Sequence, residues 1–212
     1  TNNANFGVAP TENGGAGWNT AWSVGAGTWT VSSGSMNVAN FYPNEFAYSA
    51  LMADPGNGNL SFMTRTFPAV STGSIYVAYI MRYQFNGGDK YAGLELTSNG
   101  TAKAFFGEIR DQDKRPGVAL SATSTALAFD GSYGLNDFNT DTGNVYMIVG
   151  RYNFETRSFS MKPYYKTVEI PLNEPSTWNA SNTLSAGQMN AIDGVRLVAG
   201  SSDGGGTVGQ AF

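Results

Sequence analysis

The stretch "SIYVAYIMRYQFNGGD" (74–89) decides the fold, because it joins a run of β-branched and aromatic residues to a strong turn signal. A second run of the same kind, "VYMIVGRYNF" (145–154), occurs later in the chain. Both runs are nearly continuously apolar, which is typical of strands that are covered on both sides. We therefore expect both to be central strands of a sheet.

Shorter runs of strand type surround these two, and residues that favour turns separate them. Residues 91–97 and 102–111 flank an Asn-Gly turn, which predicts a hairpin, and residues 158–170 form a second hairpin with 145–154. The other expected strands cover residues 27–38, 46–53, 60–67, 117–123 and 194–200. Because helical periodicity is confined to about one turn near 185–192, the pattern predicts a single all-β domain, a two-sheet antiparallel β-sandwich, over residues 1–212.

Composition restricts the function. The chain has no histidine and no cysteine, which excludes Ser-His-Asp hydrolases, Cys-His proteases and most zinc enzymes. Only 13% of residues are charged, the net charge is −4, and no Lys/Arg cluster occurs, so we expect no nucleic-acid partner. No apolar run is long enough to span a bilayer, so we expect no membrane insertion. Low charge and Asn/Thr/Gly-rich turns favour a secreted or cell-surface protein of bacterial origin.

Four segments resemble exported bacterial domains of the laminin-G-like, concanavalin A-like jelly-roll superfamily. The opening "GGAGWNTAWSVGAGTWTVSSGSM" is similar to their glycine- and tryptophan-rich lead, and "YAGLELTSNGTAKAFFGEI" is similar to their central hairpin. "YMIVGRYNFETRSFSMKPYY" and "AIDGVRLVAGSSDGGGTVGQAF" resemble a later hairpin and the C-terminal pair of strands. The resemblance implies a jelly-roll sandwich. Since that fold hosts lectins, adhesion modules and polysaccharide-degrading enzymes alike, function has to come from a site.

Carboxylates suited to glycoside hydrolysis are poorly placed. Glu108 and Asp111 are three residues apart, so in a strand they point to opposite faces, and Asp111 and Asp113 fall in a segment that reads as a turn. A solvated charged turn is the favoured interpretation, and no catalytic residue is predicted.

A polar loop is the best candidate for a metal site. Asp137, Asn139 and Asp141 place oxygen ligands at alternating positions in a glycine-containing loop, which suits Ca²⁺. The match to an EF-hand fails, because Thr142 and Ile148 stand where that loop needs glycine and glutamate. The alternative is a loop in which Asx side chains cap their own turns.

Aromatic residues next to amides suggest a carbohydrate site. Sugars are held by stacked aromatic rings beside polar side chains, and the candidates are Trp178, Asn179, Tyr164, Tyr165 and Trp18. Trp178 stands out because it lies in the polar loop "EPSTWNASN". For Trp22 and Trp29 a place in the core is favoured.

The C-terminal "GTVGQAF" predicts a short last strand. If this strand stays at the edge of a sheet, Thr207, Val208, Gln210 and Phe212 form an edge through which another copy can pair. The sequence thus predicts a non-catalytic extracellular module that binds glycan. The alternative is a structural subunit that assembles with copies of itself, and an enzyme ranks third.

Overall fold

The structure is a computed structural model of the 212-residue chain. It describes residues 17–32, 49–53, 60–82, 90–109, 116–124, 128–129, 145–165, 173–185, 191–201 and 209–211. These ranges contain strands and turns, and they hold no helix that is long and apolar enough to cross a membrane.

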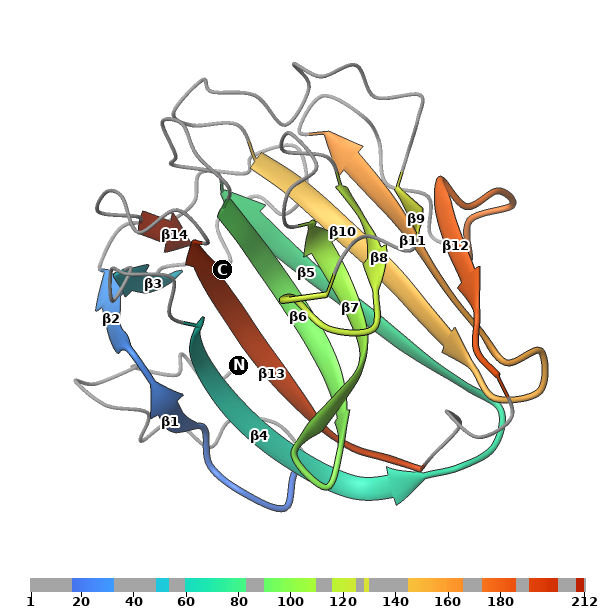
Figure 1. Cartoon of the computed structure of the whole chain (residues 1–212), viewed down its shortest axis with the longest axis horizontal. Helices are drawn as coiled ribbons and strands as arrows, with labels where there is room; N and C mark the ends of the chain where they lie inside the picture. The colour runs from blue at the N-terminus through green and yellow to red at the C-terminus, as the bar shows by residue number, and fades with distance from the viewer. Residues whose placement is uncertain are drawn as a thin grey trace.

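Two seven-stranded antiparallel sheets pack face to face (Figure 1), which confirms the predicted all-β sandwich. The first sheet has the order β1-β4-β13-β6-β7-β8-β9. Its strands are Ser23–Ala26 (β1), Leu60–Val70 (β4), Ile192–Ser201 (β13), Lys90–Ser98 (β6), Thr101–Glu108 (β7), Pro116–Ala119 (β8) and Ala128–Phe129 (β9). The second sheet has the order β12-β11-β10-β5-β14-β3-β2. Its strands are Ala180–Thr183 (β12), Ser158–Tyr165 (β11), Val145–Asn153 (β10), Ser74–Arg82 (β5), Gly209–Ala211 (β14), Ser49–Ala53 (β3) and Thr28–Ser32 (β2).

The two apolar runs are neighbouring central strands, β5 and β10, as predicted. Their cover on both sides is not complete, however. Tyr76 and Ala78 of β5 point away from the core and are exposed, whereas Val77 and Met81 are buried between the sheets. Only part of the outward side is covered, so an apolar sequence here does not mean a fully buried strand.

The main core lies between the sheets. Phe106 of β7 packs edge-on against Phe159 of β11, with ring centroids 6.3 Å apart. Gly150 of β10 makes room for this ring, because a Cβ at Gly150 would lie 2.7 Å from a Phe106 ring carbon. The Tyr79 hydroxyl of β5 donates a hydrogen bond to the Phe106 carbonyl oxygen at 2.6 Å, which joins the two sheets. Burial raises the pKa of Tyr79, so this hydroxyl keeps its proton.

A second core covers the outward side of the first sheet. It is made of Tyr91, Phe105, Ile109, Ala119, Ala122 and Val198, with Leu60 and Phe62 packed against it. In Figure 1 the segment after β8 crosses in front of β6 and β7, and the Ala122 amide donates to the Glu95 carboxylate at 2.7 Å. We call this side of the first sheet the covered face.

The Asn-Gly hairpin forms as predicted. Asn99 and Gly100 have φ angles of 49° and 74°, and Ser98 pairs with Thr101. Two positive φ angles in a two-residue loop are what a type I′ turn requires, which explains why these residue types occur here.

The C-terminal strand differs from the predicted open edge. Gln210 pairs with Met52 of β3, and Ala211 pairs with Arg82 of β5. Because β14 lies inside the second sheet, between β3 and β5, the backbone at Gln210 is not an edge for another copy. Thr207, Val208 and Phe212 lie outside the described residues.

Candidate functional site

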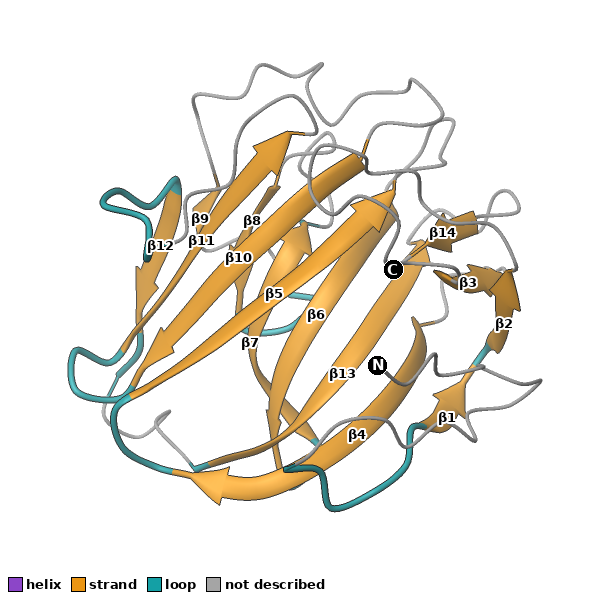
Figure 2. Cartoon of the chain, turned by 180° about the vertical axis from the view of Figure 1, so that it is seen from behind, coloured by secondary structure: helices purple, strands orange, loops and turns teal. Residues whose placement is uncertain are grey.

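The loop 173–179 lies on the outward side of the second sheet. Its end is tied to β11, where the Asn179 amide donates to the Met161 carbonyl oxygen at 3.1 Å. Lys162 Nζ donates to the carbonyl oxygen and the hydroxyl of Thr177, both at 3.3 Å. These bonds hold the loop against β11. Figure 2 shows β11 and its neighbours β10 and β5 from this side, which we call the open face.

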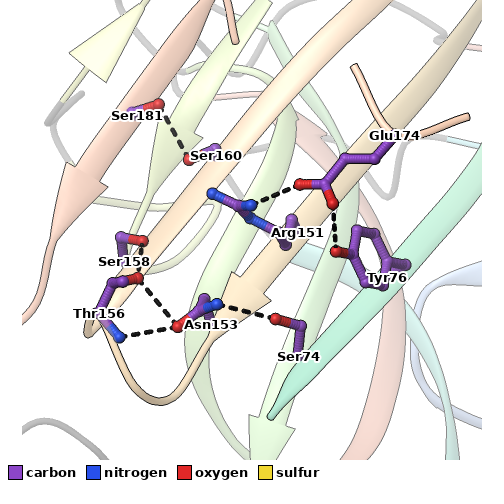
Figure 3. Close-up of polar contacts among 9 residues, drawn as sticks. All are labelled: Ser74, Tyr76, Arg151, Asn153, Thr156, Ser158, Ser160, Glu174 and Ser181. Carbon is purple, nitrogen blue, oxygen red and sulfur yellow. Dashed lines mark hydrogen bonds and ion pairs between the residues drawn. The ribbon is translucent and has the colours of Figure 1, made fainter. Parts of the chain in front are cut away.

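Glu174 in this loop connects two central strands. One carboxylate oxygen forms an ion pair with Arg151 Nη1 of β10, and the other accepts a 2.7 Å hydrogen bond from the Tyr76 hydroxyl of β5 (Figure 3). Arg151 and Tyr76 are direct neighbours in the β10–β5 register, so the sheet itself positions them for one carboxylate. The side chains of Arg151 and Glu174 are 23% and 40% exposed, and Tyr76 is 52% exposed, so all three remain accessible.

Trp178 completes the cluster. The Arg151 guanidinium carbon lies 5.0 Å from the centroid of the Trp178 ring, which is cation–π distance. Trp178 is half-buried, so part of its indole remains open to solvent. The open face therefore offers an aromatic ring, a phenol, a guanidinium and a carboxylate within one set of direct contacts.

Of the residues expected to bind sugar, Trp178 and Asn179 lie in this loop. Tyr164 is on the same side of the sheet, next to Met147 in the register, but it is buried. Its ring contacts Lys162, and burial raises the pKa of its hydroxyl. The side chain of Tyr165 lies outside the described part of the structure. Because it is buried, Tyr164 does not offer a ring surface on which a sugar could stack.

Trp18 lies elsewhere. It is 36% exposed beside β4 of the first sheet, where its ring contacts Trp22 and Phe67 and the Arg65 guanidinium carbon lies 4.4 Å from its centroid. Trp22 and Trp29 pack against the main core, as favoured from the sequence. Trp18 and Trp178 therefore belong to separate surfaces and do not form one sugar site.

Arg151, Glu174 and Tyr76 were not identified from the sequence. A signal for two of them exists, because Tyr76 and Arg151 are polar interruptions on one face of two otherwise apolar strands. Glu174 could not be paired with them in this way, since its loop reaches β10 and β5 only through the fold.

Glu108 lies in a strand, as the predicted hairpin over 102–111 requires. It is the last residue of β7 and is fully buried, so the solvated turn that is favoured for the charged run around it does not include this carboxylate. The strand extends to this position because Glu108 pairs with Ala92 on one side and Pro116 on the other. Asp111 and Asp113 lie outside the described residues.

The expected calcium ligands Asp137, Asn139 and Asp141 also lie outside the described ranges, so calcium binding there stays a prediction. Within those ranges no group of three or more acidic side chains is arranged to hold a metal ion.

The sequence matches no protein family and no curated protein. Solved structures with a similar arrangement include lectin II from Ulex europaeus, with 9% identity, a TM-score of 0.48, and coverage of 87% of this chain and 95% of that one. A winged bean acidic lectin complexed with methyl-α-D-galactose has 9% identity and a TM-score of 0.48, and 87% of this chain and 89% of that one are covered. A sialidase has 13% identity and a TM-score of 0.41, and only 16% of its length is covered, against 86% of this chain. At these values the similarities give no information about a ligand.

Proposed function

We propose that this protein is a non-catalytic, extracellular glycan-binding module, and that the open face around Trp178, Arg151, Glu174 and Tyr76 holds the sugar. The observation that carries the proposal is the Glu174 carboxylate, which both Arg151 and Tyr76 hold at the solvent-exposed surface beside the Trp178 ring. A sugar presents an apolar CH face and a dense set of hydroxyl groups. The Trp178 indole can stack on the CH face, while the Glu174 carboxylate and the Arg151 guanidinium can form hydrogen bonds with the hydroxyl groups.

The chemistry of the cluster supports binding more than catalysis. Glycoside hydrolysis by the usual route needs two carboxylates that flank the bond. Among the described residues of the open-face cluster Glu174 is the one carboxylate, and Arg151 and Tyr76 already engage both of its oxygens. A carboxylate that is fixed in this way is an acceptor for sugar hydroxyls.

The test compares two tryptophans in similar settings. Both Trp178 and Trp18 are partly exposed and carry an arginine against the ring, but they lie on separate surfaces. On a glycan array and in affinity gels, Trp178→Ala should weaken binding by about tenfold or more, since buried aromatic anchors dominate such contacts. Trp18→Ala should leave binding unchanged. Equal binding by the Trp178 variant and the wild type would remove the open face as the site.

A structural subunit that assembles with copies of itself is the second candidate, and the strand β1 is the observation that favours it. β1 is at one end of the first sheet, and Ser23, Val24 and Gly25 are exposed. An exposed edge strand can pair with another chain. If the protein assembles through β1, Val24→Lys should shift it toward the monomer in sizing experiments and by electron microscopy. An unchanged assembly would exclude this edge.

A further inference from the structure

We propose, on the basis of the glycan site above, that the ligand is an internal stretch of a linear, uncharged polysaccharide that lies across the strands β5, β10, β11 and β12. The cluster around Trp178 then binds one part of the chain. A strip of hydroxyl and amide groups beside it binds the rest.

The register of the sheet creates this strip. Asn153 of β10 pairs with Ser74 of β5 on one side and with Ser158 of β11 on the other, and Ser158 pairs with Thr183 of β12. All four side chains lie on the open face, because they are two residues along from the row that holds Arg151. Thr183 is exposed and the other three are half-buried, so the strip faces solvent. Figure 3 shows three of these side chains together with Arg151 and Tyr76.

Hydrogen bonds within the strip determine which of its hydroxyl groups can still donate to a ligand and which can still accept from it. Asn153 Nδ2 donates to the Ser74 hydroxyl at 2.9 Å, and the Thr156 hydroxyl donates to Asn153 Oδ1 at 2.9 Å. Since the single proton of Thr156 is used there, Ser158 must be the donor in its 2.7 Å contact with Thr156. The Ser74 proton and the lone pairs of Ser158 remain for a ligand. A ligand group that both accepts and donates a hydrogen bond can therefore pair with either Ser74 or Ser158, and a sugar hydroxyl is such a group.

Length and charge narrow the ligand further. Four neighbouring strands span about 14 Å at the usual strand spacing, which is enough for roughly three sugar units laid end to end. The row of Ser74, Asn153, Ser158 and Thr183 is uncharged, and Arg151 is already paired with Glu174. A chain with a carboxylate or sulfate on every unit would find no free cation in this row. A neutral chain needs none.

A length series tests the proposal. The probes are gluco-, manno- and xylo-oligosaccharides from monosaccharide to hexasaccharide, with oligogalacturonides as the acidic series, titrated by calorimetry. Affinity for one neutral series should rise from the monosaccharide to about the trisaccharide and then level off, in line with the span of the strip. The double variant Ser74→Ala/Thr183→Val should lose about threefold to tenfold in affinity for the trisaccharide and little for the monosaccharide.

The matched control is Thr101→Val, an exposed strand threonine on the first sheet, which should bind like the wild type. If affinity is equal for all lengths while Trp178→Ala still weakens binding, the strip is wrong and the glycan site stands. Tighter binding of the acidic series would overturn the assignment of a neutral chain. If no series binds and Trp178→Ala changes nothing, the proposed function fails together with the strip.

Discussion

Two arginine–glutamate pairs lie on opposite sides of this sandwich, and they differ mainly in burial. On the covered face, Arg196 Nε lies 2.8 Å from a Glu95 oxygen, with the two side chains 14% and 1% exposed. On the open face, the Arg151 and Glu174 side chains are 23% and 40% exposed. Each arginine also lies against an aromatic ring, Phe62 in the first case and Trp178 in the second.

The difference comes from what the chain lays over each sheet. On the first sheet, the Phe62 ring lies over the Arg196 guanidinium, and Ala122 of the segment after β8 is buried in the same core and donates its backbone amide to the Glu95 carboxylate. The loop 173–179 covers the second pair only in part and leaves Tyr76 exposed. The same two residue types are therefore buried in the scaffold on one side and accessible to solvent on the other.

The largest expected effect comes from the aromatic residues of the two faces. Phe105 is fully buried in the second core, whereas Tyr76 is 52% exposed. Phe105→Ala should lower the free energy of unfolding by about 3–5 kcal/mol, because it leaves a cavity. Tyr76→Ala should change stability by less than about 1 kcal/mol, and urea unfolding of both variants measures the contrast. Similar losses in both would mean that the open face is covered too.

The next effect separates the two pairs directly. Arg196→Met leaves the Glu95 carboxylate buried without its cation, which should cost about 3 kcal/mol of stability, the lower end of the range for broken buried pairs. The low end applies because Glu95 keeps its bond from Ala122 and can take up a proton. Arg151→Met in the exposed pair should cost about 1 kcal/mol or less, yet it should weaken glycan binding. The same urea titration and the glycan array measure both variants, and a larger stability loss in Arg151→Met would reverse the assignment of the two pairs.

Much of this scaffold follows from the sequence, because strand runs and turns are local signals. The stretch around Tyr76, the run that holds Arg151 and the Asn99-Gly100 turn were predicted with nearly the observed bounds. The strand β12 was missed, since its sequence "ASNT" has no apolar alternation. β1 was likewise hidden in the glycine-rich lead.

The site was less accessible to prediction, for a physical reason. Trp178 was selected because a tryptophan in a polar loop is unusual. Its partners are determined by strand register, which brings together residues such as Tyr76 and Arg151 that are far apart in the chain. The cover over Glu95 is equally non-local, because it depends on where the segment around Ala122 folds back.

A smaller effect concerns pH. Burial raises the pKa of Glu95, and the nearby Arg196 and the Ala122 amide oppose this shift only in part. A carboxyl group whose pKa is higher in the folded state binds its proton more tightly there. The stability that it contributes is fully present below its unfolded pKa of about 4.3, and it is lost as pH rises through the folded pKa.

Glu95→Gln mimics the protonated group at every pH. The wild type should therefore lose stability relative to this variant as pH rises from about 4 through the higher folded pKa, and the difference should then stay constant. Thermal unfolding of both proteins across this range measures it, and Glu174→Gln serves as the exposed counterpart. If the stability of the wild type instead rises relative to that of Glu95→Gln with increasing pH, the attraction of the Arg196 charge outweighs the cost of burying the carboxylate.

The smallest effect on stability is expected for Tyr76→Phe, which removes one hydroxyl and keeps the ring. The lost bond to Glu174 is exposed, so water can replace it, and the free energy of unfolding should change by no more than about 0.5 kcal/mol. Binding should respond more, because the phenol fixes one of the two Glu174 oxygens, and a carboxylate held by Arg151 alone can rotate away from the sugar. We expect affinity for the preferred glycan to fall by about threefold, the equivalent of one modest hydrogen bond.

Tyr79→Phe is the matched control, since it removes a buried tyrosine hydroxyl that joins the sheets. It should cost about 1–2 kcal/mol of stability and leave affinity unchanged. If Tyr76→Phe binds as tightly as the wild type, Glu174 does not need its second anchor, and the site reduces to Trp178, Arg151 and Glu174.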